Sequence, residues 1–236
     1  MMATKEKTVG EIAREYPAAA RVLEQYGIDF CCGGNRLIEE VCNEKGISIE
    51  KLISDLETST ATRSASAVDW NTARLGTLID HIVATHHEYL RTALPRLEAM
   101  LEKVIAAHGD RHSDSLKPLA ENFSEVKAEL ESHMPKEEMV LFPYIVRLEA
   151  ASLVGAPAPP APFGSIANPI RMMEMEHASA GRSLAEMRRV TSDYTAPEDA
   201  CNTYRAMLHE MAELEADLHV HIHLENNILF PRAMKM

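Results

Sequence analysis

One phrase of eleven residues occurs twice in this 236-residue chain, at 133–143 and at 221–231. Each copy reads His, three residues, Glu, three residues and Leu-Phe-Pro, so it couples His133 to Glu137 and His221 to Glu225. In an α-helix, residues i and i+4 lie one turn apart on the same face. Each copy therefore predicts an imidazole beside a carboxylate, a donor set that suits a transition-metal ion.

Both pairs interrupt stripes of apolar residues that repeat in steps of three and four. Such steps mark the face of a helix that points into the core of a bundle. A lone buried carboxylate is costly and is nearly always paired or bound to a metal. The two stripes are Phe123, Val126, Leu130, His133, Glu137, Val140 and Met211, Leu214, Leu218, His221, Glu225, Ile228.

His87 and His177 occupy equivalent positions in two further apolar stripes. The separation from His87 to His133 is similar to that from His177 to His221, which suits two antiparallel helix pairs related by a pseudo-twofold axis. The sequence therefore predicts an all-α four-helix bundle. Inward-facing His and Glu on bundle helices build carboxylate-bridged dimetal sites. The predicted metal ligands are His87, His133, Glu137, His177, His221 and Glu225.

Nitrogen and oxygen donors without thiolate favour iron or manganese, allow zinc, and argue against copper(I) or an iron-sulfur cluster. Six protein ligands leave positions on two metal ions for water, hydroxide or a diatomic molecule. The alternative is a buried hydrogen-bonded network without metal, which requires every member to be satisfied.

Several other residues compete for a role near this site. We prefer His87 to His86 because the stripe of His87 stays apolar as far as Val104, whereas that of His86 reaches Arg96. Glu176, beside His177, either supports the site or is a solvated helix residue, and we favour the second interpretation.

Four more histidines are expected to be less important. His219 and His223 do not align with His133 in the repeat, so we expect them at the surface or behind the ligands. His108 and His112 flank Gly109 in an expected interhelix loop, where we predict no specific role.

The first sixty residues predict a separate small helical unit. Thr8 and Glu11 form a capping-box pattern that begins a short helix. Pro17 can open a second helix and Gly27 can end it, while Ser48 can cap another that ends near Glu57. The predicted domains are 1–57, a linker at 58–68 and a bundle at 69–236.

Between these helices, Asp29 and Phe30 precede Cys31, Cys32, Gly33 and Gly34. Adjacent cysteines are poorly placed for an ordinary disulfide, and two glycines allow a turn with positive φ that would expose both thiols. A thiol needs a lowered pKa or a metal contact to react at neutral pH. The alternative is a pair of small buried residues in a tight turn.

The chain resembles the iron-sulfur cluster repair di-iron proteins (the RIC, YtfE or ScdA type) along essentially its whole length. The resemblance rests on the Asp-Phe-Cys-Cys-Gly-Gly turn, the bundle histidines, and the Leu-Glu-Asn-Asn and Leu-Phe-Pro segments. The resemblance implies a hemerythrin-like bundle with two iron ions as cofactor. It makes the four histidines terminal ligands, Glu137 and Glu225 bridging carboxylates, and Cys31 and Cys32 the thiols that act with the irons. Pro135 departs from a regular helix and predicts a kink that affects the reach of Glu137.

The net charge of −12 disfavours nonspecific binding to nucleic acid, and the chain has no long apolar run that predicts a membrane span or a signal peptide. Cys42 and Cys201, with the adjacent pair, do not form a secreted disulfide framework. We therefore expect a cytoplasmic protein, and we expect a homodimer.

The resemblance implies a stress-response function, the repair of iron-sulfur clusters damaged by nitric oxide or peroxide. Its partners would be damaged iron-sulfur proteins, with nitric oxide or oxygen as small ligand. Two alternatives use the same ligands: a protein that only binds or scavenges nitric oxide or oxygen, and a di-iron nitric oxide reductase. Whether the protein is an enzyme is left open by the sequence.

Overall fold

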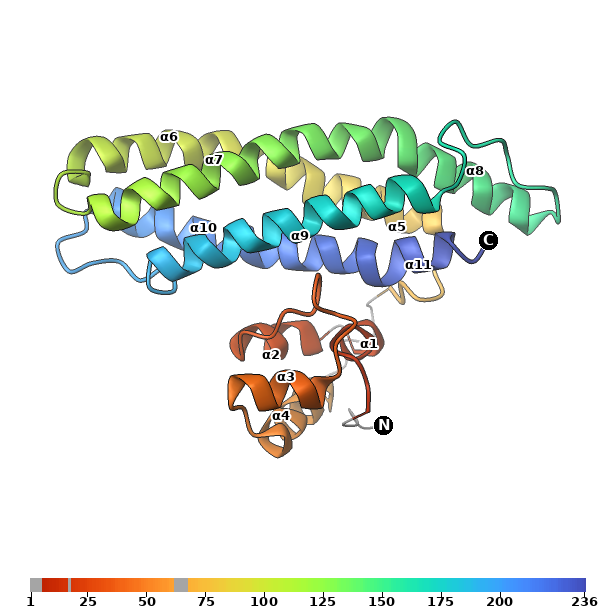
Figure 1. Ribbon diagram of the computed structural model, residues 1–236, viewed down its shortest axis with the longest axis horizontal. Coiled ribbons are helices and arrows are strands. Elements are labelled where there is room, and N and C mark those ends of the chain that lie inside the picture. Colours follow the sequence, from red (N-terminus) through yellow and green to blue (C-terminus); the bar gives the residue numbers. More distant parts are fainter. Residues whose placement is uncertain (1–5, 17, 62–67) are drawn as a thin grey trace. The chain divides into compact units, whose positions relative to one another are not determined.

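The computed structural model describes residues 6–16, 18–61 and 68–236, and it confirms the predicted all-α fold (Figure 1). The chain divides into two compact units. One comprises Met1–Leu78 together with His219–Met236, and the other comprises Ile79–Leu218. Among the described residues, no helix combines the length and the apolar composition needed to cross a membrane.

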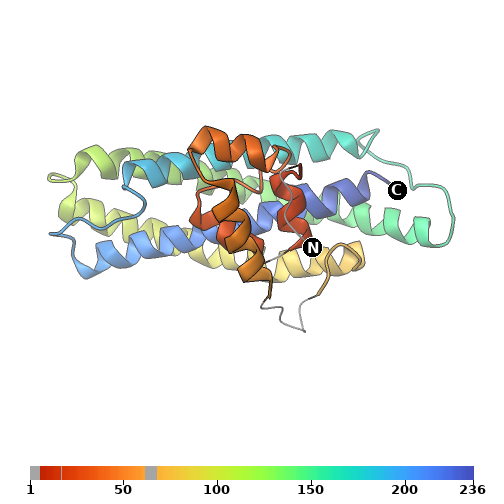
Figure 2. The same cartoon turned by 90° about the horizontal axis from the view of Figure 1, so that it is seen from below.

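The second unit is a four-helix bundle whose successive long helices run antiparallel, with nearly parallel axes (Figures 1 and 2). Its helices are α6 (Glu88–His108), α7 (Ser113–Lys136), α9 (Ala167–Val190) and α10 (Asn202–His223). Val140, which ends one predicted stripe, is instead 46 % exposed because it lies in a wide π-helical turn, and Leu141 is buried in its place. The other residues of the predicted stripes face the core. It includes Leu90, Leu94, Leu97, Leu101, Phe123, Val126, Leu130, Leu184, Met187, Met211, Leu214 and Leu218, all at most 4 % exposed.

Three short π-helical turns interrupt these helices, and each contains a predicted metal ligand. The turns are η1 (Val83–His87), η2 (Glu137–Leu141) and η3 (Leu224–Leu229). They connect the long helices to α5 (Leu75–Ile82), α8 (Phe142–Leu153) and α11 (Phe230–Ala233). Wide turns of this kind occur frequently at functional sites.

The repeated Leu-Phe-Pro explains two of these turns. Pro143 and Pro231 have no N–H to donate and crowd the carbonyl four residues earlier, which disfavours a regular α-helix at that point. The preceding Phe142 and Phe230 instead donate to the carbonyls of Glu137 and Glu225, five residues back. Pro135 lies within α7, which continues as far as Lys136, and the kink predicted at Pro135 stays a prediction.

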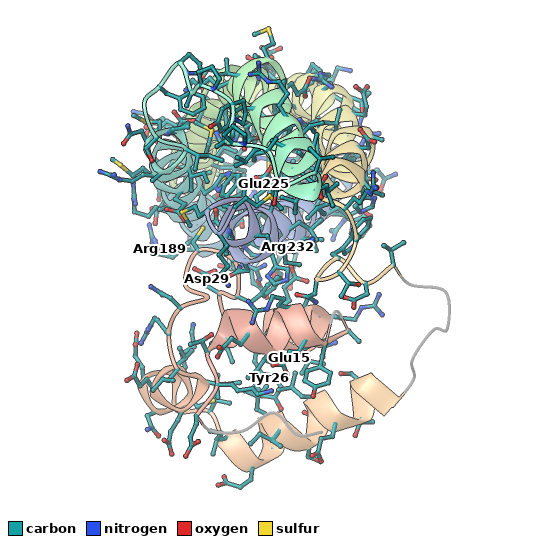
Figure 3. All side chains as sticks on the ribbon, turned by 90° about the vertical axis from the view of Figure 1, so that its right-hand side faces the viewer. Glu15, Tyr26, Asp29, Arg189, Glu225 and Arg232 are labelled. Carbon is teal, nitrogen blue, oxygen red and sulfur yellow. The ribbon has the colours of Figure 1, made fainter. Side chains whose placement is uncertain are left out.

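The N-terminal helices are α1 (Val9–Glu15), α2 (Ala19–Gln25), α3 (Ile38–Lys45) and α4 (Ile49–Ala61). The capping box of Thr8 and Glu11 is confirmed, and Gly27 follows α2 with a φ of 61°. Tyr26, labelled in Figure 3, donates to Asp55 at 2.6 Å and so ties the end of α2 to α4. The core of these helices includes Val9, Ile12, Leu23, Phe30, Ile38, Cys42, Leu52 and Leu56.

The last N-terminal helix is longer than predicted. The helix expected to end near Glu57 continues to Ala61, so the first residues of the predicted linker at 58–68 are helical. Pro17 and residues 62–67 lie outside the described part of the chain, and with them the predicted start of the second helix and most of that linker.

Candidate metal centre and cysteine turn

Within the bundle unit, four of the predicted ligands converge. His133 and His177 face each other with their Nε2 atoms 3.1 Å apart. Oε2 of Glu137 lies 3.3 Å from Nε2 of His133 and 3.5 Å from Nε2 of His87. All four side chains are at most 3 % exposed. His133, Glu137 and His177 each offer a ligand atom within 4.8 Å of the others.

Carboxylates hold the outer nitrogens of two of these rings. Nδ1 of His87 lies 2.5 Å from Oε1 of Glu138, and Nδ1 of His133 lies 2.7 Å from Oε2 of Glu176. Because a carboxylate accepts, each Nδ1 donates, and Nε2 is the nitrogen of each ring that faces Glu137. A cation at this point would find imidazole nitrogens and a carboxylate oxygen around it. Histidines that bind metals commonly donate their other N–H to a carboxylate in this way.

Both supporting carboxylates stay ionised at neutral pH. Burial alone would raise the pKa of Glu138, but hydrogen bonds with His87 and Arg91 outweigh it, and the pKa is lowered. Burial also opposes ionisation of Glu176, and hydrogen bonds with Lys136 and His133 again lower the pKa. The interpretation of Glu176 as a solvated residue is therefore wrong, because it holds the ring of His133.

His86, the competitor of His87, is also buried, but its Nδ1 lies 2.9 Å from Asp217 of α10. Its neighbour His87 is the ring that lies beside Glu137. His87 as the metal ligand stays a prediction. The contact of His86 with Asp217 gives that histidine a different partner.

The remaining predicted ligands belong to the C-terminal segment of the other unit. Nε2 of His221 lies 3.2 Å from Oε1 of Glu225, and both side chains are at most 1 % exposed. His221 lies on α10 and Glu225 on η3, so the pair spans the change from α to π geometry.

The carboxylate of Asp29 organises the cysteine turn between α2 and α3 (Figure 3). Its Oδ1 accepts from the backbone N–H groups of Cys31 at 3.0 Å and Cys32 at 2.9 Å, and its Oδ2 accepts from that of Gly33 at 2.9 Å. The Cys31 thiol lies 3.2 Å from the same Oδ1 and 3.9 Å from the sulfur of Cys32. Asp29, Cys31 and Cys32 form a compact group of potential metal ligands.

The turn is not the exposed one that we predicted. Cys31 is 4 % exposed, and Cys32 is half-buried. The hydrogen bond to Cys32 and burial together raise the pKa of the Cys31 thiol well above its usual range, opposite to the lowered pKa that a reactive thiol needs. Gly33 and Gly34 are not among the residues with positive φ. A Cβ on Gly34 would lie 2.7 Å from Oδ1 of Asn227, so this glycine allows a close approach.

Asn227 of η3 holds this turn within its unit. Its Nδ2 lies 3.1 Å from the carbonyl oxygen of Phe30 and 3.3 Å from that of Cys31. The same Nδ2 lies 3.1 Å from Nδ1 of His223, whose ring packs against Phe30 with centroids 5.6 Å apart. Burial lowers the pKa of His223 to about 4, so its ring is neutral and accepts from the amide. His223 therefore supports the cysteine turn.

Four supporting groups were missed by our reasoning from the sequence. Asp29 and Asn227 were noted only as members of a sequence motif, with no role of their own. No role was predicted for Glu138 or Asp217. Glu138 directly follows a predicted ligand, and Asp217 lies four residues before His221. Their closeness in sequence to predicted ligands could have marked Glu138 and Asp217 as candidates. It does not predict which distant histidine each carboxylate contacts.

Comparison with known proteins agrees with this arrangement. Residues 78–233 match the hemerythrin HHE cation binding domain, and residues 5–60 match ScdA_N, a domain of unknown function. The chain is 38 % identical to the iron-sulfur cluster repair protein YtfE of Pectobacterium carotovorum, over 99 % of both chains. The chain belongs to the YtfE family of iron-sulfur cluster repair proteins.

Two further relatives have similar coverage. A probable iron-sulfur cluster repair protein of Haemophilus influenzae is 36 % identical over 99 % of both chains, and a YtfE protein of Yersinia pseudotuberculosis is 36 % identical over 98 % of both. The match over 78–233 makes the bundle of this YtfE-family chain a metal-binding domain, with clustered His and Glu side chains to serve it.

Proposed function

We propose that His87, His133, Glu137, His177, His221 and Glu225 bind two iron ions. The donor set supports this, because buried imidazoles and carboxylates on bundle helices are the ligands of carboxylate-bridged di-iron proteins. The single observation that carries the proposal is the convergence of His87, His133 and His177 around Glu137, with supporting carboxylates behind two of the rings.

Helix continuity supports the inclusion of the C-terminal pair. Met211, Leu214 and Leu218 of α10 lie in the bundle core. The same helix continues to His223, and the steps from Leu218 to His221 and on to Glu225 are three and four residues. Residues at such steps share one helix face, so we assign His221 and Glu225 to the core face.

Each protein group has a distinct part in the proposed centre. Glu137 and Glu225 would hold the irons through carboxylate oxygens, and the four histidines would hold them through ring nitrogens. Glu138 and Glu176 help to set the orientation of two of these rings. With six protein ligands, iron held here supplies positions for nitric oxide or oxygen. Pairing of Glu138 with Arg91 and of Glu176 with Lys136 keeps both supporting carboxylates charged, which makes the bound imidazoles better donors.

We propose that the protein repairs iron-sulfur clusters damaged by nitrosative or oxidative stress in the cytoplasm. The names of the full-length relatives support this function, and damaged iron-sulfur proteins are then its targets. Cys31 and Cys32 would be the thiols that hold iron as cargo for a damaged cluster. Because the pKa of the Cys31 thiol is raised, we expect metal contact to deprotonate it.

Recovery of a nitric-oxide-damaged [4Fe–4S] dehydratase such as aconitase tests this function. Iron-loaded protein should restore its activity, whereas His133→Leu and the double variant Cys31→Ala/Cys32→Ala should not. Matched controls are His209→Leu and Cys201→Ala, which alter exposed residues and should retain recovery. Full recovery by both site variants would reject the mechanism. Nitrosyl formation without any recovery would favour a protein that only binds nitric oxide.

A further inference from the structure

A second cluster of potential metal ligands lies at the other end of the long helices from the proposed iron centre. His108 is the last residue of α6, His112 precedes the first residue of α7, and Asp199 lies in the connection before α10. His108 follows His87 by 21 residues along one helix. That length corresponds to about 30 Å at 1.5 Å per residue, so the two clusters are independent.

The backbone brings the two histidines together. The carbonyl oxygen of His108 accepts from the N–H groups of both Arg111 and His112, each at 3.0 Å, which closes a tight turn between α6 and α7. Nε2 of His112 lies 2.8 Å from Oδ1 of Asp199. Ligand atoms of His108, His112 and Asp199 all lie within 4.8 Å of one another.

His108 has a buried ring nitrogen that can bind a cation. Its side chain is 6 % exposed, and its Nδ1 is buried without a hydrogen-bond partner in the part of the chain that the structure describes. Packing against Tyr204, with ring centroids 5.4 Å apart, accounts for burial of the ring but gives Nδ1 no hydrogen bond. A buried polar atom without a partner costs free energy that coordination to a cation would offset.

Arg111 orients the carboxylate of this cluster. Its Nη1 lies 3.1 Å from Oδ2 of Asp199, which leaves Oδ1 directed toward His112. Two imidazoles and one carboxylate are a three-ligand set for zinc, in which water takes the fourth position. Asp199 is partly exposed, so a hydrated ion can enter from solvent.

We propose that His108, His112 and Asp199 bind one divalent transition-metal ion of the zinc type, separate from the iron centre. The ion joins the turn between α6 and α7 to the connection between α9 and α10. The proposal gives His108 and His112 a specific role, which we did not expect from the sequence.

Titration of the full-length, iron-loaded protein with Zn²⁺ tests the site. We expect one zinc per chain, with affinity lowered at least about 10-fold by His112→Asn and by Asp199→Asn, since even loss of a ligand's hydrogen-bond partner has such an effect. The matched control His209→Asn changes an exposed histidine of α10 and should bind zinc normally. Zinc should also shift the ring ¹⁵N resonances of His108, a readout that needs no variant.

The His133→Leu variant separates this proposal from the iron centre, because it should lose iron and keep the zinc site. Equal zinc isotherms for the unaltered protein, His112→Asn and Asp199→Asn would overturn the proposal. Zinc binding that disappears in His133→Leu but persists in His112→Asn would equally overturn it, since the zinc would then occupy the iron site.

Discussion

At the scale of single residues, the proposed centre depends on carboxylates that are not themselves ligands. Glu138 lies in η2 and contacts the ring of His87. Glu176 lies in α9 and contacts the ring of His133. Such a contact decides which imidazole nitrogen carries the proton, and therefore which nitrogen faces the metal.

Replacing Glu176 by Gln should weaken iron binding by about 10- to 100-fold without unfolding the protein, because His133 loses a charged hydrogen-bond partner. Metal-buffered titration measures the affinity. Glu174→Gln is the matched control, since Glu174 is an exposed carboxylate on the same helix. Equal affinities for both variants would mean that Glu176 does not support a metal ligand.

The raised pKa of Cys31 predicts how its reactivity depends on pH. A raised pKa favours the protonated thiol, so the thiolate that reacts with iodoacetamide forms only well above the ordinary pKa of about 8.5. At pH 8 we expect metal-free protein to be alkylated at exposed Cys201 at least about 10-fold faster than at Cys31. The reason is that raising a thiol pKa by one lowers the fraction of thiolate about 10-fold when the pH is below the pKa. Peptide mass spectrometry measures both rates, and faster modification of Cys31 would contradict the assignment.

At the scale of helices and turns, hydrophobic periodicity predicted the bundle well. Steps of three and four placed His133, Glu137 and His177 on buried faces, where the structure has them. The π-helical turns escaped prediction because the steps of three and four assume regular α-helical turns. In η2 the step from Glu137 to Val140 fails, since Val140 is exposed and Leu141 is buried. Carboxylate partners such as Glu176 also escaped, since their contacts join residues more than 40 positions apart.

The glycine turn shows a different limit of sequence reasoning. Paired glycines after Cys32 suggested positive φ, but their small size serves close packing against Asp29 and Asn227. Sequence reveals that a Cβ is absent at such a position. It does not distinguish an unusual backbone angle from a neighbouring atom that needs the space.

Replacing Asn227 by Ala should loosen the cysteine turn, because the carbonyls of Phe30 and Cys31 lose a shared donor. We expect alkylation of Cys31 to accelerate by about 5-fold or more, the effect of losing roughly 1 kcal/mol of hydrogen bonding. Mass spectrometry after timed labelling checks this, with exposed Asn43→Ala on α3 as the matched control. An unchanged rate in Asn227→Ala would show that the amide does not hold the turn.

At the scale of the whole molecule, the proposed ligands come from all four long helical segments. A metal centre of this kind links segments that otherwise meet through apolar packing. The segments carrying His221 and Glu225 also carry Asn227, so the C-terminal stretch both contributes proposed ligands and holds the cysteine turn.

Removing the metal should therefore lower thermal stability. A ligand present at 1,000 times its Kd stabilises the folded state by about 4 kcal/mol. For a domain of this size, that corresponds to a fall in Tm of about 10 °C on chelation. Calorimetry of iron-loaded and chelator-treated protein measures the difference, and His177→Leu should already melt at the lower temperature with or without iron. Identical melting of loaded and chelated protein would exclude a metal that links the helices.

The iron content of the purified protein tests the central claim most directly. After anaerobic loading with ferrous iron and removal of excess, elemental analysis should find two irons per chain, and His133→Leu or Glu137→Gln should retain fewer. Protein that stays free of iron under these conditions would contradict the account, because the buried imidazoles and carboxylates would then bond only to one another.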